Sequence, residues 1–122
     1  MTRKEFEKEV AKAIDGLPAP VRQKLDNVLF LVERRPTAEQ LRSGGLPPDD
    51  TMLGFYDGTP LTERSHDDLR LPDRIFLFQE PIEEDYGPRR EDIAKGIWET
   101  VEHEVGHYLG MSEEDLEEHG LD

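Results

Sequence analysis

Near the end of the chain, apolar residues recur at four-residue intervals over a long stretch. These residues are Ile93, Ile97, Val101, Val105 and Leu109. Such spacing places one apolar stripe along a helix, and Gly110 directly after it is a typical helix end. The pattern therefore predicts a long helix over residues 93–109, which must bury its stripe against another layer of the protein.

The rest of the chain predicts shorter elements. Thr2, followed by Glu5 three residues later, is a capping-box start for an amphipathic helix over residues 3–15. Short apolar runs rich in strand-forming residues predict strands over 27–33, 52–56 and 73–79. Together with the long helix, these elements indicate a chain that mixes helices and strands.

Three further predictions concern the ends of these elements. Pro72 and Pro81 bracket the third predicted strand, which suggests a place near the edge of the sheet. Residues 83–88 carry no periodicity, so we expect an acidic turn there. Ser112 can cap a short last helix through His119.

The acidity of the chain is concentrated in its C-terminal third. The net charge is -14, and residues 80–122 hold 15 acidic against 3 basic side chains, whereas residues 1–79 hold 14 against 12. A nucleic-acid binder needs clustered lysine and arginine to displace counterions from phosphate, so nucleic acid is not expected as a partner. The acidic region is interpreted either as a field that attracts cations and basic peptides or as a solvated face.

Composition also bounds the compartment and the metal chemistry. Cysteine is absent, so metal ligands must be histidine or carboxylate. No segment approaches about eighteen continuous apolar residues, and the N-terminus carries mixed charges, so neither a membrane span nor a signal peptide is expected. We expect a soluble, cytoplasmic protein whose 122 residues form a single domain, 1–122.

The most specific motif is His103-Glu104-Val105-Gly106-His107 on the long predicted helix. Two imidazoles four residues apart lie about 40° apart on one helical face, where both can bind one metal ion. The same angles place them roughly 120–160° from the centre of the apolar stripe. Glu104 lies beside them, where it can act as a general base without being a ligand. The alternative is that three polar residues coincide on a solvated helix face.

The residues after the motif extend the metal-site pattern. Gly110 follows His107 by three residues, and a glycine there can take a left-handed conformation, end the helix and turn the chain back toward the metal. Glu113 then stands where the metzincin pattern carries its third histidine.

The segment HEVGHYLGMSEEDL resembles the signature of a family of small bacterial zincin-like proteins, the minimal zincins. The segments GFYDGTPLTERS and LPDRIFLFQEPI are also similar to that family, so the resemblance covers most of the chain. It implies an α+β fold with an N-terminal helix, a small mixed sheet of three to four strands, and a long metal-bearing helix near the C-terminus.

The resemblance also implies the roles of the site residues. His103 and His107 would be zinc ligands, Glu104 the general base, and the acidic residue Glu113 the third ligand. The family usually has aspartate at this last position, so here the sequence departs from the family pattern.

These observations predict a zinc-dependent metallopeptidase that holds one Zn²⁺ per chain and hydrolyses peptide bonds with Glu104 as general base. A peptide or flexible protein segment is the expected partner, lying along the sheet edge near residues 74–79. The alternative is a non-catalytic, zinc-stabilised module that binds a peptide or protein. Two imidazoles and a carboxylate would also suit iron(II).

Three other residues have side chains whose chemistry would suit such a site. Tyr86 is a candidate hydrogen-bond donor to a developing oxyanion, whereas Tyr108 falls inside the apolar stripe and is expected in the core. His66 stands between acidic residues in a predicted loop and is expected to be solvated.

Overall fold

The computed structural model describes residues 1–60, 62 and 71–111. Its elements run in the order α1 (Arg3–Asp15), α2 (Ala19–Arg22), β1 (Val28–Glu33), α3 (Ala38–Ser43), β2 (Gly54–Asp57), β3 (Asp73–Phe78), α4 (Gln79–Tyr86) and α5 (Arg90–Tyr108). The short helix predicted after Ser112 lies outside these residues, as do His66 and Glu113. No helix within the described part of the chain is long and apolar enough to span a membrane.

The described strands form one mixed sheet in the order β1-β3-β2. β1 runs parallel to β3, with Val28 opposite Asp73, and β2 runs antiparallel to β3, with Gly54 opposite Leu77. The prediction that β3 lies near the sheet edge is therefore wrong, because β3 is paired on both sides. Pro72 and Pro81 lie just outside the strand, so their missing N–H groups cost no hydrogen bond of the ladder.

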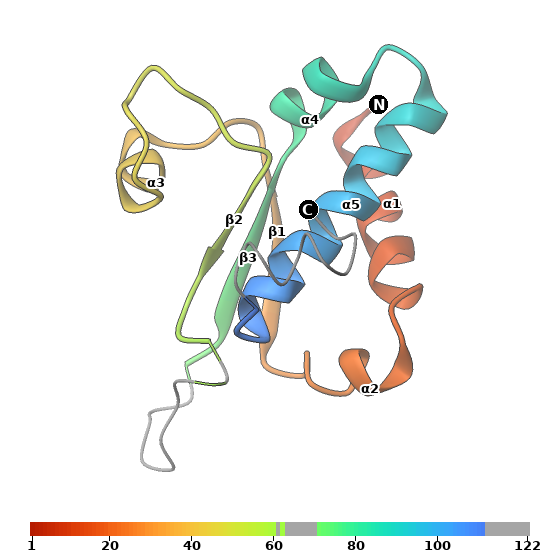
Figure 1. Ribbon diagram of the computed structural model, residues 1–122. Coiled ribbons are helices and arrows are strands. Elements are labelled where there is room, and N and C mark those ends of the chain that lie inside the picture. The colour runs from red at the N-terminus through yellow and green to blue at the C-terminus, as the bar shows by residue number, and fades with distance from the viewer. Residues whose placement is uncertain (61, 63–70, 112–122) are drawn as a thin grey trace.

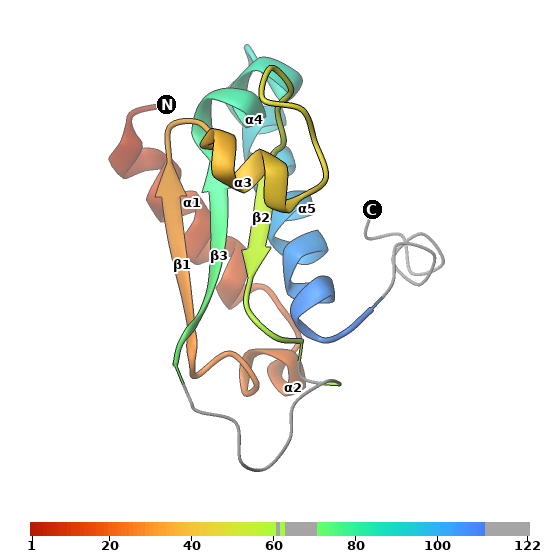
Figure 2. The same ribbon diagram turned by 90° about the vertical axis from the view of Figure 1, so that its left-hand side faces the viewer.

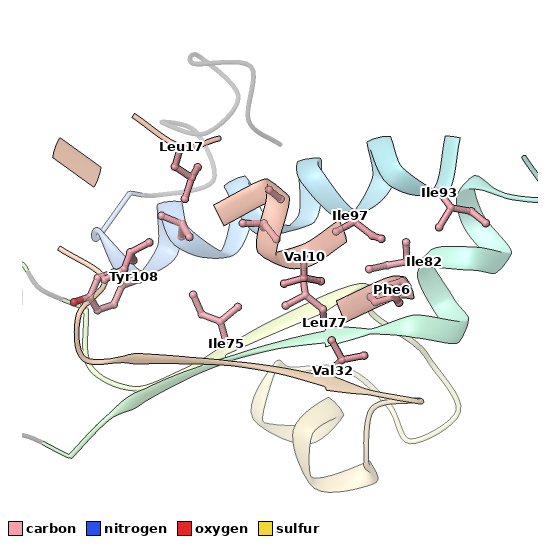
Figure 3. Packing of buried hydrophobic residues seen from close by; sticks show 14 residues of the cluster. Phe6, Val10, Leu17, Val32, Ile75, Leu77, Ile82, Ile93, Ile97 and Tyr108 are labelled. Atoms are coloured by element: carbon pink, nitrogen blue, oxygen red, sulfur yellow. The ribbon is translucent and has the colours of Figure 1, made fainter. Parts of the chain in front are cut away.

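Two long helices cover one face of the sheet, and the short helix α3 lies on the other face (Figures 1 and 2). The core fills the space between α1, α5 and the sheet (Figure 3). It contains the predicted apolar stripe of α5 and the inward side chains of α1 and β3, which include Phe6, Val10, Ile75, Leu77, Ile97 and Val101. The long helix thus buries its stripe as the spacing predicted.

Capping explains where two of the helices start. The Thr2 side chain accepts a hydrogen bond from the Glu5 backbone N–H, and the Glu5 carboxylate accepts one from the Thr2 N–H, which confirms the predicted capping box of α1. Thr37 and Gln40 form a second capping box at α3, which the sequence reading missed. That helix is only 6 residues long, too short to show a clear period.

The prediction of an acidic turn over 83–88 is wrong for most of that segment, because α4 runs through residue Tyr86. Pro81 stands in its first turn, where backbone N–H groups have no partner within the helix, so the proline is tolerated. Pro81 and Ile82 are buried, and Ile82 belongs to the core cluster and so holds this helix against it. Tertiary packing therefore outweighs the weak periodicity of this segment.

Candidate metal site and its cleft

The two motif histidines lie on the last turns of α5, and their rings meet edge to face with an interplanar angle of 78°. Their Nε2 atoms are 3.1 Å apart, and both side chains are half-buried. Two nitrogen ligands at about 2.0–2.1 Å from one tetrahedral zinc ion would lie about 3.3 Å apart. The pair of imidazoles therefore fits a zinc ion, although the same separation also allows one ring to donate a hydrogen bond to the other.

Glu104 completes a cluster with the two histidines. One potential ligand atom from each of His103, Glu104 and His107 lies within 4.8 Å of the others. The Glu104 side chain is buried, with 7% exposed, which is more enclosed than a helix flank facing solvent. The cause is β2, which lies against this side of α5.

Gly54 allows β2 to approach α5 this closely. A Cβ atom at Gly54 would lie 2.8 Å from Cγ2 of Thr100, 3.0 Å from Cγ of Glu104 and 3.1 Å from the carbonyl oxygen of Phe76. Any larger residue would have to push the strand away from the helix. Gly54, which the sequence predicts only as part of a strand, thus brings the edge of the sheet to the predicted general base.

The end of α5 has the left-handed glycine that the sequence predicted. Gly110 has a φ of +86°, its N–H donates to the carbonyl of His107, and the N–H of Met111 donates to the carbonyl of Gly106. This pair of hydrogen bonds is a Schellman motif. The chain beyond Met111 lies outside the described residues, so the third ligand, Glu113, stays a prediction.

A cavity of about 300 Å³ opens beside the cluster. His103 and Glu104 form part of its wall, and its further lining includes Met52, Leu53, Tyr86, Glu99 and Thr100. These residues come from the approach to β2, the end of α4 and the middle of α5. The cavity is thus created by tertiary packing and has no counterpart in a local sequence motif.

One hydrogen bond joins two polar residues of this cavity. The Tyr86 hydroxyl donates to Oε2 of Glu99 at 2.8 Å. Burial raises the pKa of Tyr86 to about 12, aided by the hydrogen bond to Glu99 and the charges of Glu99 and Asp85. Burial and the charge of Glu99 also raise the pKa of the Glu102 carboxyl.

Tyr86 and Tyr108 have different environments. Tyr108 is buried in the core, as predicted, and its hydroxyl donates to the carbonyl of Lys24 at 2.7 Å. Tyr86 does reach the cavity next to the motif, but its hydroxyl is bound to Glu99. Glu99 itself was missed, although a signal was available, since it precedes His103 by one helical turn.

Comparison with known families agrees with this fold and cluster. The sequence model of the zincin-like metallopeptidase family matches residues 25–121. That match covers most of the chain, and the protein therefore belongs to the zincin-like metallopeptidase family. Membership implies a metal, typically zinc, and the His-Glu-His cluster offers donors suited to one ion. No curated protein matches the chain.

Proposed function

We propose that the protein is a zinc-dependent metallopeptidase, with His103, His107 and Glu113 as the zinc ligands and Glu104 as the general base. The observation that carries this proposal is the pairing of two imidazole Nε2 atoms 3.1 Å apart with a buried carboxylate beside them. A site that serves only the fold has no need of an acid at this position, whereas hydrolysis requires one.

The chain's own residues have separate tasks in this reaction. Zinc, when bound, supplies a Lewis acid that lowers the pKa of a water molecule toward neutrality and polarises the peptide carbonyl. Glu104 takes a proton from the attacking water and later gives it to the leaving amine. Gly54 lies so close that a Cβ atom there would come within 3.0 Å of Cγ of Glu104, and this proximity limits the directions in which the Glu104 side chain can point.

The substrate peptide is proposed to bind beside β2. The expectation that it pairs with residues 74–79 is wrong, because β3 has a strand on each side. β2 is an edge strand of the described sheet, and its first residue, Gly54, touches Glu104. An extended peptide that adds to this edge through main-chain hydrogen bonds would pass the general base.

One observation favours the alternative, a zinc-stabilised module that binds a peptide or protein without cutting it. The hydroxyl of Tyr86, the candidate oxyanion donor, already donates a hydrogen bond to Glu99. Stabilisation of the oxyanion would then need another donor, and a module that only binds peptides would need none.

The substitution Glu104→Gln separates the two functions, because it keeps the size of the side chain and removes its basicity. For a peptidase, zinc content stays the same and turnover falls by about a hundredfold or more. Turnover is measured by mass spectrometry of new termini in a peptide mixture incubated with the zinc-loaded protein. A matched control is Glu91→Gln, whose side chain is 74% exposed on the first turn of α5.

Two results would contradict the assignment. A parent protein that holds zinc and cuts no peptide would support the binding module. Loss of zinc in the Glu104→Gln variant would mean that Glu104 is itself a ligand or supports one, and its role as general base would have to be given up.

A further inference from the structure

The cavity beside Glu104 extends along α5 from His103 toward the start of the helix. Glu99 precedes His103 by four residues and therefore lies about 6 Å further along the helix axis. The cavity volume of about 300 Å³ is at the lower end of the range for ligand pockets. A cavity of this size suits one side chain better than a longer peptide segment. A substrate side chain that fills this cavity would belong to a residue next to the peptide bond that is cleaved with Glu104 as general base.

The lining of the cavity combines apolar walls with two carboxylates. Met52 and Leu53 provide apolar surface, and Glu99 and Glu104 provide two carboxylates, while no lysine or arginine is among the described residues that line it. Lysine and arginine side chains match such a lining, because their methylene stems pack on apolar surface and their charged ends bind carboxylates.

Glu99 carries a negative charge that a metal ion in the proposed site would not neutralise. A divalent ion held by the histidines would be offset by Glu104 and by the predicted third ligand, Glu113. Among the described residues, Lys95 pairs with Glu99, with Nζ 3.9 Å from Oε1, and the Lys95 side chain is 71% exposed. Such surface pairs are weak, so a substrate cation can replace Lys95 at little cost.

Tyr86 holds the Glu99 carboxylate in place. Its hydroxyl donates to Oε2, and its ring packs so closely on Gly96 that a Cβ atom there would lie 2.4 Å from Cδ2 of the ring. With a pKa of about 12, the phenol keeps its proton and stays a donor at neutral pH. The orientation of the carboxylate is therefore set before a ligand arrives.

We propose that this cavity is a specificity pocket that binds the lysine or arginine side chain of a peptide, and that Glu99 determines the preference. The proposal rests on the proposed function, since it assigns a substrate class to the same site. Glu99 is a specificity residue here and takes no part in the proton transfer assigned to Glu104.

Binding is tested with short fluorescein-labelled alanine-glycine peptides that differ in one central residue, which is lysine, norleucine, glutamine or glutamate. The zinc-loaded Glu104→Gln variant is used, so that no peptide is cut, and affinity is read from fluorescence anisotropy. We expect the lysine peptide to bind at least about fivefold more tightly than the norleucine peptide, which has the same stem without the charge.

Two further variants, made in the same Glu104→Gln background, locate the preference. Glu99→Gln keeps an acceptor for the Tyr86 hydroxyl and should reduce the preference for lysine to within about twofold. Glu91→Gln changes the net charge equally at an exposed position of the same helix and should keep the preference. Circular dichroism and zinc content show whether each variant is folded.

The outcomes separate this proposal from the proposed function. Equal binding of the lysine and norleucine peptides, a preference that survives Glu99→Gln, or no binding of any peptide would overturn the pocket. A preference that depends on Glu99, together with a parent protein that leaves the lysine peptide uncut, would support the pocket and contradict the peptidase. Cleavage by the parent next to lysine would support both.

Discussion

At the scale of single residues, the identity of the third ligand decides how the metal is held. Glu113→Ala should weaken zinc affinity by at least about a hundredfold, because losing a ligand costs more than losing a residue that only supports one. Glu114→Ala and Asp115→Ala remove the same charge from neighbouring positions and serve as controls. Competition with a chromophoric zinc chelator measures all three. Equal losses at the three positions would show that the register taken from the family resemblance is wrong.

The sequence predicted part of the candidate site at this scale. The four-residue spacing of His103 and His107 placed both on one helical face, and the structure brings their Nε2 atoms to 3.1 Å. Glu104 was predicted beside them, but its burial was not, because burial depends on a strand about fifty residues earlier in the chain. The cavity with Glu99 could not be predicted for the same reason, since three separate segments form it.

At the scale of elements, the end of α5 sets the direction in which the chain leaves the site. A Cβ atom at Gly110 would lie 2.3 Å from Oγ1 of Thr62, and its φ of +86° disfavours any side chain. Gly110→Ala should therefore lower the free energy of unfolding by about 1–3 kcal/mol and also weaken zinc binding. Urea denaturation and chelator competition measure the two effects.

Gly45 offers a matched control for this prediction. It has a φ of +78°, and a Cβ atom there would meet nothing within 4 Å. Gly45→Ala should cost stability through its backbone conformation alone and leave zinc affinity unchanged. If the two variants weaken zinc binding equally, the turn at Gly110 does not orient the third ligand.

Elements differ in how well the sequence predicted them, and length explains much of the difference. α1 and α5 have 13 and 19 residues, so each repeats its apolar spacing over several turns. α2 and α3 have 4 and 6 residues, which is too short for a periodic signal. The central place of β3 was also missed, since flanking prolines report on the ends of a strand and say nothing of its neighbours.

The link between α1 and α5 should make stability depend on pH. Glu5 accepts a hydrogen bond from the Thr2 backbone and one from Arg90, at the start of α5. The Thr2 backbone first, and then Arg90, lower the pKa of Glu5 from 4.5 to about 2. The folded state thus favours the ionised carboxylate. The stabilisation that the Glu5 carboxylate contributes is fully present above its pKa in the unfolded chain. It is lost as the pH falls through the pKa of about 2 that Glu5 has in the folded protein.

The substitution Glu5→Gln tests this dependence, because glutamine keeps the capping box and removes the charge. The parent should be more stable than the variant at pH 7, and the difference in unfolding free energy should shrink as the pH falls from 4.5 toward about 2. Urea denaturation across this pH range measures the difference. If the difference in unfolding free energy between the parent and the variant stays constant with pH, the charge of Glu5 contributes nothing through its hydrogen bonds to Thr2 and Arg90.

At the scale of the whole molecule, α5, which carries the two candidate histidine ligands, packs against a helix outside the region that the family model matches. The family match begins at residue 25, yet Phe6 and Val10 of α1 are buried in the same core as Ile97 and Val101 of α5. The sheet supports α5 on the opposite side of this core (Figure 3). The site is therefore placed by contacts from both ends of the chain.

Because the candidate metal site is placed by contacts from both ends of the chain, binding of zinc should stabilise the entire fold. The purified protein should hold about one zinc per chain, and a ligand that binds only the native state at a hundred times its Kd adds about 2.7 kcal/mol. For a chain of this size, removing the metal with a chelator should then lower Tm by roughly 8–15 °C. Metal analysis by mass spectrometry and thermal unfolding followed by circular dichroism check the two parts of the prediction.

The control is the double variant His103→Ala/His107→Ala, which lacks both predicted imidazole ligands. It should contain no zinc, and the same chelator should leave its Tm unchanged, because no ion links its native state to metal concentration. A Tm shift of equal size in this variant would mean that zinc stabilises the fold from another place. A parent protein that takes up no zinc after reconstitution, or that retains iron(II) in its stead, would contradict the assignment of the metal itself.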